Sequence, residues 1–189
     1  MTKSPIRLLG IGGSSRAQSV TRNVLAEVLN IATELGAETE LVSVHDLALP
    51  VYNEDIPFEE QPQSLHDLLE KMKLADGFLV ASPTYHSSIG GGIKNALDAL
   101  HILHGAPGTY FDGRPVGLIA YGGPSAINSI NALLHTTRGM RALVVPTSLT
   151  VSRAQLDSER TTIADETTRN RATTLVSEVI QLAKLLRPA

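Results

Sequence analysis

Short apolar runs alternate along the chain with longer segments in which apolar residues recur every three or four positions. The short runs have the length of strands, and the longer segments have the spacing of one helical face. The predicted strands are Ile6–Ile11, Glu40–Val44, Gly77–Ala81, Val116–Ala120 and Ala142–Val145. The predicted helices are Val20–Leu35, Ser64–Leu74, Gly92–Leu103, Ser125–Met140 and Thr161–Leu186, and His45–Gln61 is expected to be a long surface loop.

The predicted strands are continuously apolar, which is typical of strands covered on both faces of a parallel sheet. Strands that alternate with helices and are joined by right-handed crossovers give an α/β, doubly wound, five-stranded parallel sheet in a three-layer sandwich. We expect the strand order 2-1-3-4-5 and a single domain over residues 1–189. Ligands of such sheets bind beyond the carboxyl ends of the strands, here between strands one and three.

Composition narrows the classes of function. Lys and Arg number 16 against 19 for Asp and Glu, a net charge of −3, so we expect neither a nucleic acid nor a membrane surface as partner. The chain has no cysteine, which excludes disulfides, thiolate metal sites and a thiol nucleophile. Residues 1–5 lead directly into an apolar strand and no long apolar stretch follows, so a cytoplasmic protein is expected.

The first turn, Gly12–Thr21, has the chemistry of an anion site. It joins a strand to a helix amino terminus and combines glycines, several hydroxyls and one guanidinium, that of Arg16. A serine here can simply cap the helix, but an arginine in a tight turn favours a terminal phosphate monoester. The P-loop pattern is absent, and the dinucleotide fingerprint is half present as Gly10, Gly12 and Ser15, so a dinucleotide-binding protein without flavin stays an alternative.

The second unusual turn, Ser82–Asp98, follows the third predicted strand. Pro83 and the three glycines Gly90–Gly92 predict an irregular backbone that can lie against a flat ring and offer N–H and C=O groups along its edge. Tyr85 can stack on such a ring or pack in the protein. His101 and His104 lie three residues apart on a helix, and we interpret them as a packed or interface pair and expect no metal.

Together the two turns resemble the signatures of the NADPH-dependent FMN reductase family. The matching residues are Gly13-Ser14-Ser15-Arg16 with Ser19, and Ser82-Pro83-Thr84-Tyr85 running through to Lys94-Asn95-Ala96-Leu97-Asp98. The segment 46–53 is similar to the family's loop after strand two, and the chain departs from many members at Gly90 and Ala99. The resemblance implies a flavodoxin-like fold, FMN as cofactor and NADPH or NADH as reductant.

Carried over position by position, the resemblance also implies site residues. Those expected to hold the FMN phosphate are Ser14, Arg16, Ser19, Val20 and Thr21. Those expected to line the isoalloxazine edge, chiefly through backbone groups, are Pro83, Thr84, Tyr85, His86 and Ser87, with Gly122 and Gly123 of a third turn on the pyrimidine side. Hydride transfer needs alignment and N–H groups that stabilise negative charge, so no side chain is assigned as catalytic acid or base.

The implied reaction passes a hydride from NAD(P)H through FMN to a small acceptor, such as a free flavin, a quinone, an azo compound or an oxyanion. A flavin-dependent monooxygenase is one further candidate partner, and the family implies a homodimer or homotetramer. A non-catalytic flavin-binding electron carrier or redox sensor stays open as an alternative, although such shuttles are usually more acidic than −3.

Overall fold

Five parallel strands form the centre of the molecule, in the order β2-β1-β3-β5-β6. The computed structural model describes residues 4–106, 108 and 110–187. The strands are β1 (Arg7–Gly12), β2 (Glu38–Ser43), β3 (Gly77–Tyr85), β5 (Pro115–Tyr121) and β6 (Leu143–Val151). A sixth, two-residue strand, β4 (Ser88–Ile89), pairs antiparallel with the end of β3. The predicted order of five parallel strands is therefore confirmed, and β4 is an addition to it.

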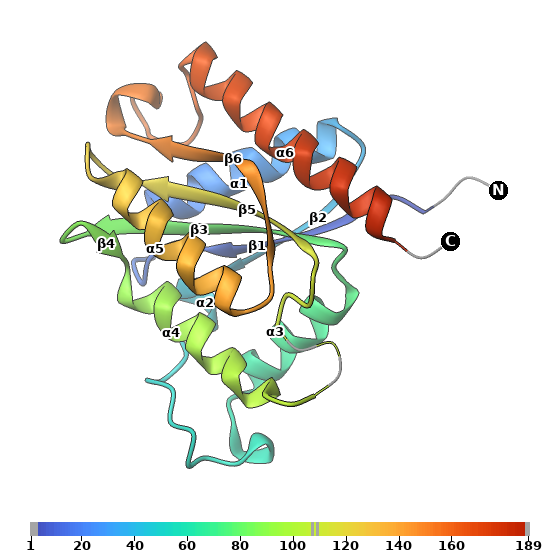
Figure 1. Ribbon diagram of the computed structural model, residues 1–189. Helices are drawn as coiled ribbons and strands as arrows, with labels where there is room; N and C mark the ends of the chain where they lie inside the picture. Colours follow the sequence, from blue (N-terminus) through green and yellow to red (C-terminus); the bar gives the residue numbers. More distant parts are fainter. Residues whose placement is uncertain (1–3, 107, 109, 188–189) are drawn as a thin grey trace.

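Helices cover both faces of the sheet (Figure 1). They are α1 (Val20–Glu34), α2 (Val44–Leu47), α3 (Gln63–Leu74), α4 (Gly91–Ala99), α5 (Ala126–Gly139) and α6 (Glu166–Leu186), with short 3-10 turns at Phe58–Glu60, Leu100–Leu103 and Arg153–Gln155. Helices α1 and α6 lie on one face, and α3, α4 and α5 lie on the other. The predicted loop after β2 begins with the short helix α2.

Each face of the sheet has its own apolar core because neighbouring residues of a strand point to opposite sides. Leu8 packs with α1 and α6, whereas Leu9 packs with α3 and α4. The second core contains an edge-to-face contact between the rings of Phe78 and Phe111, with centroids 5.0 Å apart. The guanidinium of Arg114 lies 4.8 Å from the centroid of the Phe78 ring.

Burial on both faces holds for the central strands but not for the edge strands. β1, β3 and β5 are buried almost throughout, whereas β2 and β6 carry exposed positions along their length. The prediction that all five strands are covered on both faces is therefore wrong for the two edges. Both are edge strands, each paired with a neighbouring strand on one side only.

Strand β6 is longer than predicted and contains an irregularity. The register with β5 shifts between Val116 and Leu118, next to Pro146, which has no N–H for the ladder. Glu178 of α6 accepts the backbone N–H of Thr147 at 2.9 Å and its hydroxyl at 2.8 Å. The helix thus supplies the acceptor that the shifted ladder lacks.

Helix α6 begins at Glu166, five residues later than predicted. Asp165 caps it by accepting the backbone N–H of Thr168 at 2.8 Å, and the bonds from Thr168 lower the pKa of Asp165. Thr161 belongs to the preceding loop, where its hydroxyl and N–H donate to Asp157. Those bonds lower the pKa of the Asp157 carboxyl.

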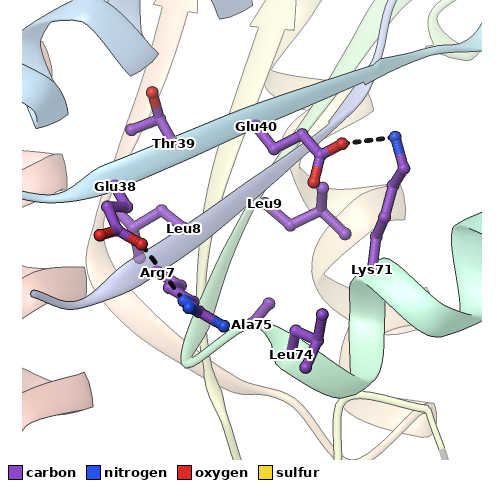
Figure 2. Close-up of a pocket in the computed structure, with 9 residues that line it drawn as sticks. All are labelled: Arg7, Leu8, Leu9, Glu38, Thr39, Glu40, Lys71, Leu74 and Ala75. Atoms are coloured by element: carbon purple, nitrogen blue, oxygen red, sulfur yellow. Dashed lines mark hydrogen bonds and ion pairs between the residues drawn. The ribbon is translucent and has the colours of Figure 1, made fainter. Parts of the chain in front are cut away.

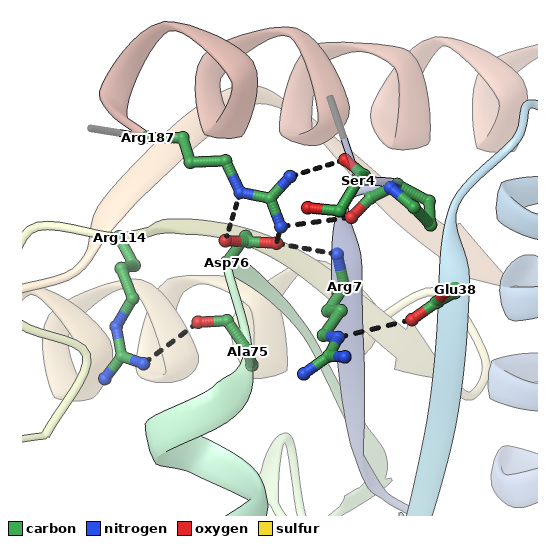
Figure 3. Close-up of polar contacts among 8 residues, drawn as sticks. Ser4, Arg7, Glu38, Ala75, Asp76, Arg114 and Arg187 are labelled. Carbon is green, nitrogen blue, oxygen red and sulfur yellow. Dashed lines mark hydrogen bonds and ion pairs between the residues drawn. The ribbon is translucent and has the colours of Figure 1, made fainter. Parts of the chain in front are cut away.

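The two ends of the described chain are joined at the amino ends of the strands (Figure 3). Arg187, which follows α6, donates to both carboxylate oxygens of Asp76, at 3.2 and 2.8 Å. The same guanidinium donates to the carbonyl oxygens of Ser4 at 2.6 Å and Pro5 at 3.0 Å. Asp76 also accepts the N–H of Arg7 at 2.8 Å, so this Arg187–Asp76 cluster links α6 to the starts of β1 and β3.

Two further observations concern possible membrane and metal sites. Within the described ranges, no helix is long and apolar enough to span a bilayer. The rings of His101 and His104 stack with centroids 5.0 Å apart, and both Nδ1 atoms lie near the hydroxyl of Tyr110, at 3.3 and 3.4 Å. The rings of the two histidines contact each other at the surface, and no cluster of three metal-ligating side chains occurs among the residues whose positions are given.

Candidate functional site

The carboxyl ends of β1, β3 and β5 lie side by side at one edge of the sheet. Gly12, the last residue of β1, pairs with Ala81 of β3, and Pro83 pairs with Tyr121 of β5. The three turns that leave these strands therefore meet at the topological switch point, where doubly wound sheets bind their ligands. All twelve predicted site residues lie on these turns, at the carboxyl end of β3 or on the first turn of α1.

Two glycines shape the first turn, which we call the phosphate turn (residues 12–19). A Cβ on Gly12 would lie 2.3 Å from the carbonyl oxygen of Ala81, so only glycine allows β1 to lie this close to β3. Gly13 has a φ of +104°, a left-handed conformation that disfavours any side chain. The chain can therefore bend sharply over the end of β3 before α1 begins.

Hydroxyl groups organise the inside of the phosphate turn. Ser19 is the N-cap of α1, and its buried Oγ accepts the N–H of Arg22 at 3.3 Å and the N–H of Ser14 at 2.9 Å. The hydroxyl of Ser14 donates to Ser19 Oγ at 3.0 Å, and Ser14 Oγ accepts the N–H of Arg16 at a longer 3.4 Å. Ser19 is thus a helix cap, and it also joins both ends of the turn.

The electrostatics of the phosphate turn favour an anion. Residues 12–22 contain no acidic side chain and two arginines, Arg16 and Arg22, and both side chains are exposed. Neither guanidinium forms an ion pair in the described part of the chain. The amino terminus of α1 adds N–H groups and the positive end of the helix dipole, so the chemistry of these residues fits a phosphate monoester. Val20 and Thr21 form the first helical turn, with Thr21 buried.

The second turn is a regular hairpin, not the irregular backbone that Pro83 and the glycines predicted. β3 continues through Tyr85 and returns as β4, with Thr84 opposite Ile89 and Tyr85 opposite Ser88. The two connecting residues, His86 and Ser87, have φ values of 49° and 60°. Two positive φ angles in a two-residue connection are the pattern of a type I′ turn, which normally contains Asn and Gly. The tip is exposed, and so is Tyr85, at 49%.

The third turn is packed directly against the second. A Cβ on Gly122 would lie 2.7 Å from Cβ and 2.8 Å from Oγ1 of Thr84, whereas a Cβ on Gly123 would meet nothing within 4 Å. Thr84 Oγ1 is also bonded to the hydroxyl of Ser129 on α5, at 2.9 Å. Gly122 donates its N–H to the carbonyl oxygen of Val151 at 2.9 Å. The second and third turns therefore form one continuous wall, with Gly123 exposed at its rim.

Pro83 and Ser82 fix the base of the hairpin. Ser82 is fully buried, and its hydroxyl oxygen accepts the N–H of Gly90 at 3.0 Å. A Cβ on Gly90 would lie 2.9 Å from Cγ of Pro83, so the hairpin closes against this proline ring. Pro83 is buried, which makes it a packing residue at the foot of the wall; Thr84, Tyr85, His86 and Ser87 rise from it toward solvent.

Residues outside the predicted set also support the site. Asn95 of α4 holds the long loop after α2: its Oδ1 accepts the N–H of Tyr52 at 2.8 Å and its Nδ2 donates to the carbonyl oxygen of Pro50 at 2.8 Å. Burial raises the pKa of the Tyr52 hydroxyl, and the negative charge of Glu54 raises it further. His45 of α2 is bonded to the phosphate turn, with Nδ1 3.0 Å from the carbonyl oxygen of Ser15. His45 directly follows the second predicted strand, and parallel strands end at the same side of a sheet. That position was the available signal that His45 would lie near the phosphate turn.

Cavities lie at the carboxyl ends and at the amino ends of the strands, and the side chains that line them differ in charge. A hollow of about 350 Å³ adjoins the phosphate turn and is lined by Ser15, His45, Gly92 and Asn95 with apolar neighbours. Another, of about 280 Å³, lies at the amino ends of β1 and β2 (Figure 2). Its charges pair with one another, Arg7 with Glu38 and Lys71 with Glu40, which leaves no uncompensated charge for a ligand. The switch-point edge is the better candidate site.

The fold is that of the flavodoxin-like proteins. The chain superposes on FerB, an NAD(P)H:acceptor oxidoreductase from Paracoccus denitrificans, with a TM-score of 0.76 at 21% identity, covering 95% of this chain and 98% of that one. A flavodoxin from the domain Archaea superposes with a TM-score of 0.60 at 11% identity, covering 95% and 99%. Both comparisons concern the fold alone.

Sequence comparison gives the family. The model of the NADPH-dependent FMN reductase family matches residues 6–155, and the chain belongs to that family. It is 32% identical to an NAD(P)H-dependent FMN reductase of Pseudomonas aeruginosa over 114 residues, 60% of this chain and 58% of the relative, so less than two thirds of that protein is matched. It is 26% identical to the NADPH-dependent FMN reductase ArsH of Shigella flexneri, over 97% of this chain and 71% of ArsH. It is 29% identical to an NADPH azoreductase of a Bacillus species, over 75% and 74%.

Membership of this family confirms the resemblance that the two turns predicted. FMN and NAD(P)H are the cofactors named for this family and its relatives, and the flavodoxin-like fold was expected from the same two turns. Family membership does not identify the residues that would hold FMN, and the three turns of this chain are the candidates for that role.

Proposed function

We propose that the chain is an FMN-dependent NAD(P)H oxidoreductase that reduces a small acceptor. The observation that carries the proposal is the convergence of three turns at the switch point, one of them free of acidic residues and bearing Arg16. When bound there, FMN would supply the transfer of a hydride from NAD(P)H to the acceptor. The protein supplies binding, orientation and a polar environment.

The proposed contacts to the FMN phosphate come from the phosphate turn and the start of α1. Ser14 and Ser19 offer buried hydroxyls, Arg16 offers an exposed guanidinium, and Val20 and Thr21 lie where the unpaired N–H groups of the helix begin. Gly12 lets the turn lie close against Ala81 of β3, and the left-handed Gly13 places no side chain beside Ser19. The residues present therefore fit the group.

The proposed contacts to the isoalloxazine ring come from the wall formed by the second and third turns. Thr84, Tyr85, His86 and Ser87 lie on one side of it above the buried Pro83, and Gly122 and Gly123 lie on the other. Backbone N–H groups in such a wall can stabilise negative charge on the reduced ring without any reorganisation. No side chain is assigned the role of catalytic acid or base.

Flavin titration tests the phosphate contacts. We expect FMN to bind at least about tenfold more tightly than riboflavin, because charge-assisted hydrogen bonds are strong and only FMN has the phosphate. Arg16→Ala should remove most of that ratio, whereas Arg138→Ala, at an exposed position on α5, should leave it unchanged. Equal affinity for FMN and riboflavin in the wild type would contradict the proposed site.

Rapid mixing tests the enzyme assignment against a passive flavin carrier. The FMN-loaded protein should lose flavin absorbance on mixing with NADPH before any acceptor is present. Turnover with a free flavin, a quinone, an azo dye and an oxyanion then identifies the acceptor class; relatives are named azoreductases and ArsH. A flavin that stays oxidised with both NADPH and NADH would favour the carrier.

Three finer points belong to the same proposal: a homodimer or homotetramer, a cytoplasmic location and delivery of reduced flavin to a flavin-dependent monooxygenase. The exposed Lys94–Asp98 ion pair on α4, with Nζ and Oδ1 2.6 Å apart, is one surface on which a second copy could dock. Light scattering on the purified protein gives the mass directly. A monomeric mass at micromolar concentration would remove the oligomer from the proposal.

A further inference from the structure

His45 makes the single side-chain contact from the segment after β2 to the phosphate turn in the described hydrogen bonds. Its Nδ1 lies 3.0 Å from the carbonyl oxygen of Ser15. A carbonyl oxygen can only accept, so Nδ1 carries the proton and donates. Ser15 and Arg16 are exposed residues at the outside of the turn, where the backbone has few other contacts to hold it.

A bond to the Ser15 carbonyl also sets the direction of the next N–H. In a trans peptide the C=O of one residue and the N–H of the following residue point in opposite directions across a rigid plane. Because His45 draws the Ser15 C=O outward, the N–H of Arg16 points inward, and it is found 3.4 Å from the hydroxyl oxygen of Ser14. This inward bond is long for N–H···O and therefore weak.

From this geometry we infer that His45 is a positioning residue for the anion site: it holds the Ser15–Arg16 peptide so that the Arg16 N–H faces the place of the FMN phosphate. The inference rests on the proposed function. The weak bond to Ser14 can be exchanged for a stronger, charge-assisted bond from the Arg16 N–H to a phosphate oxygen. The contact comes from the His45 side chain on the short helix α2.

The test compares FMN with riboflavin in three variants of His45. His45→Ala should weaken FMN binding about tenfold and change riboflavin binding less than about twofold, since riboflavin has no phosphate to meet the Arg16 N–H. His45→Asn should restore FMN binding, because the Asn Nδ2 occupies nearly the position of the histidine Nδ1 and donates. His45→Gln, whose amide reaches the Nε2 position, should not restore it.

His135→Ala is the matched control, because His135 is an exposed histidine on α5, away from the turns. Circular dichroism of each variant shows whether the fold is kept. The inference is overturned if His45→Ala leaves FMN affinity unchanged, if it weakens FMN and riboflavin equally, or if Gln restores binding as well as Asn. A wild type that binds no FMN overturns the proposed function itself, a result distinct from any of these.

Discussion

Gly122 and Gly123 are adjacent and chemically identical, yet the structure gives them different roles. Only Gly122 touches the second turn, where a Cβ would overlap Thr84. We expect Gly122→Ala to lower the free energy of unfolding by about 1–3 kcal/mol, because the added methyl must push the two turns apart. Gly123→Ala should be neutral or slightly stabilising. Urea unfolding of both variants makes the comparison, and equal effects would contradict the wall described above.

His86 and Ser87 hold a conformation that side chains disfavour. A left-handed conformation costs a residue with a Cβ roughly 1–2 kcal/mol, and a glycine avoids this cost. Glycine also has more freedom in the unfolded chain, which offsets about 0.5–1 kcal/mol of that gain. Ser87→Gly should therefore raise the free energy of unfolding by about 0.5–1 kcal/mol. Ser88→Gly, one residue further and outside the positive-φ set, should lower it. Chemical denaturation without flavin is the measurement, and a loss of stability in Ser87→Gly would show that the turn is unstrained.

Such residue-level features were only partly accessible from the sequence. The glycines and serines of the first turn, together with Arg16, predicted an anion site through their chemistry. The hairpin at His86–Ser87 was missed because neither residue is Asn or Gly, the usual signal for two positive φ angles. The contact of His45 with Ser15 joins residues 30 positions apart, and only the parallel register of β1 and β2 brings them together.

At the scale of elements, α1 depends on its cap more than α5 does. The Ser19 hydroxyl accepts two backbone N–H groups, whereas Ser125 stands at the N-cap of α5 without a side-chain bond to it. We expect Ser19→Ala to lower the free energy of unfolding by about 1–2 kcal/mol and Ser125→Ala to change it by less than about 0.5 kcal/mol. Thermal unfolding of the pair decides the matter; similar shifts would mean that Ser19 does not act as the cap.

The element order followed from the sequence, and the element ends did not. Apolar periodicity depends on burial, so it located β1, β3 and β5, which lie in the middle of the sheet. At β6 it found only the first part of the strand, ending at Val145, because an edge position, Pro146 and the contact of Thr147 with Glu178 replace apolar burial beyond it. The start of α6 was misplaced because Thr161 and Asp157 form a local hydrogen-bonded loop whose composition resembles a helix start.

At the scale of the whole molecule, the Arg187–Asp76 cluster is the link between the last helix and the first strand. Its side chains are about one fifth exposed, 21% for Arg187 and 18% for Asp76, so solvent screens the pair only in part. Arg187→Ala should lower the free energy of unfolding by about 2 kcal/mol, because a charged pair and two carbonyl bonds are lost together.

Lys73→Ala is the control for that prediction. Lys73 pairs with Glu70 at 2.5 Å, but both side chains are more than 60% exposed, and such surface pairs contribute little. Its removal should change the free energy of unfolding by less than about 0.5 kcal/mol. Urea unfolding of both variants is sufficient, and an Arg187→Ala protein as stable as Lys73→Ala would show that the cluster does not hold the chain ends together.

The same cluster has a practical consequence for handling the protein. Ser4 and Arg187 lie together at the amino ends of the strands, whereas the three turns lie at the carboxyl ends, on the opposite side of the molecule. A bead or an electrode coupled near Ser4 or Arg187 would hold every molecule in one orientation, with the proposed flavin site facing the solution. An immobilised preparation should therefore keep its access to dissolved reductant and dye.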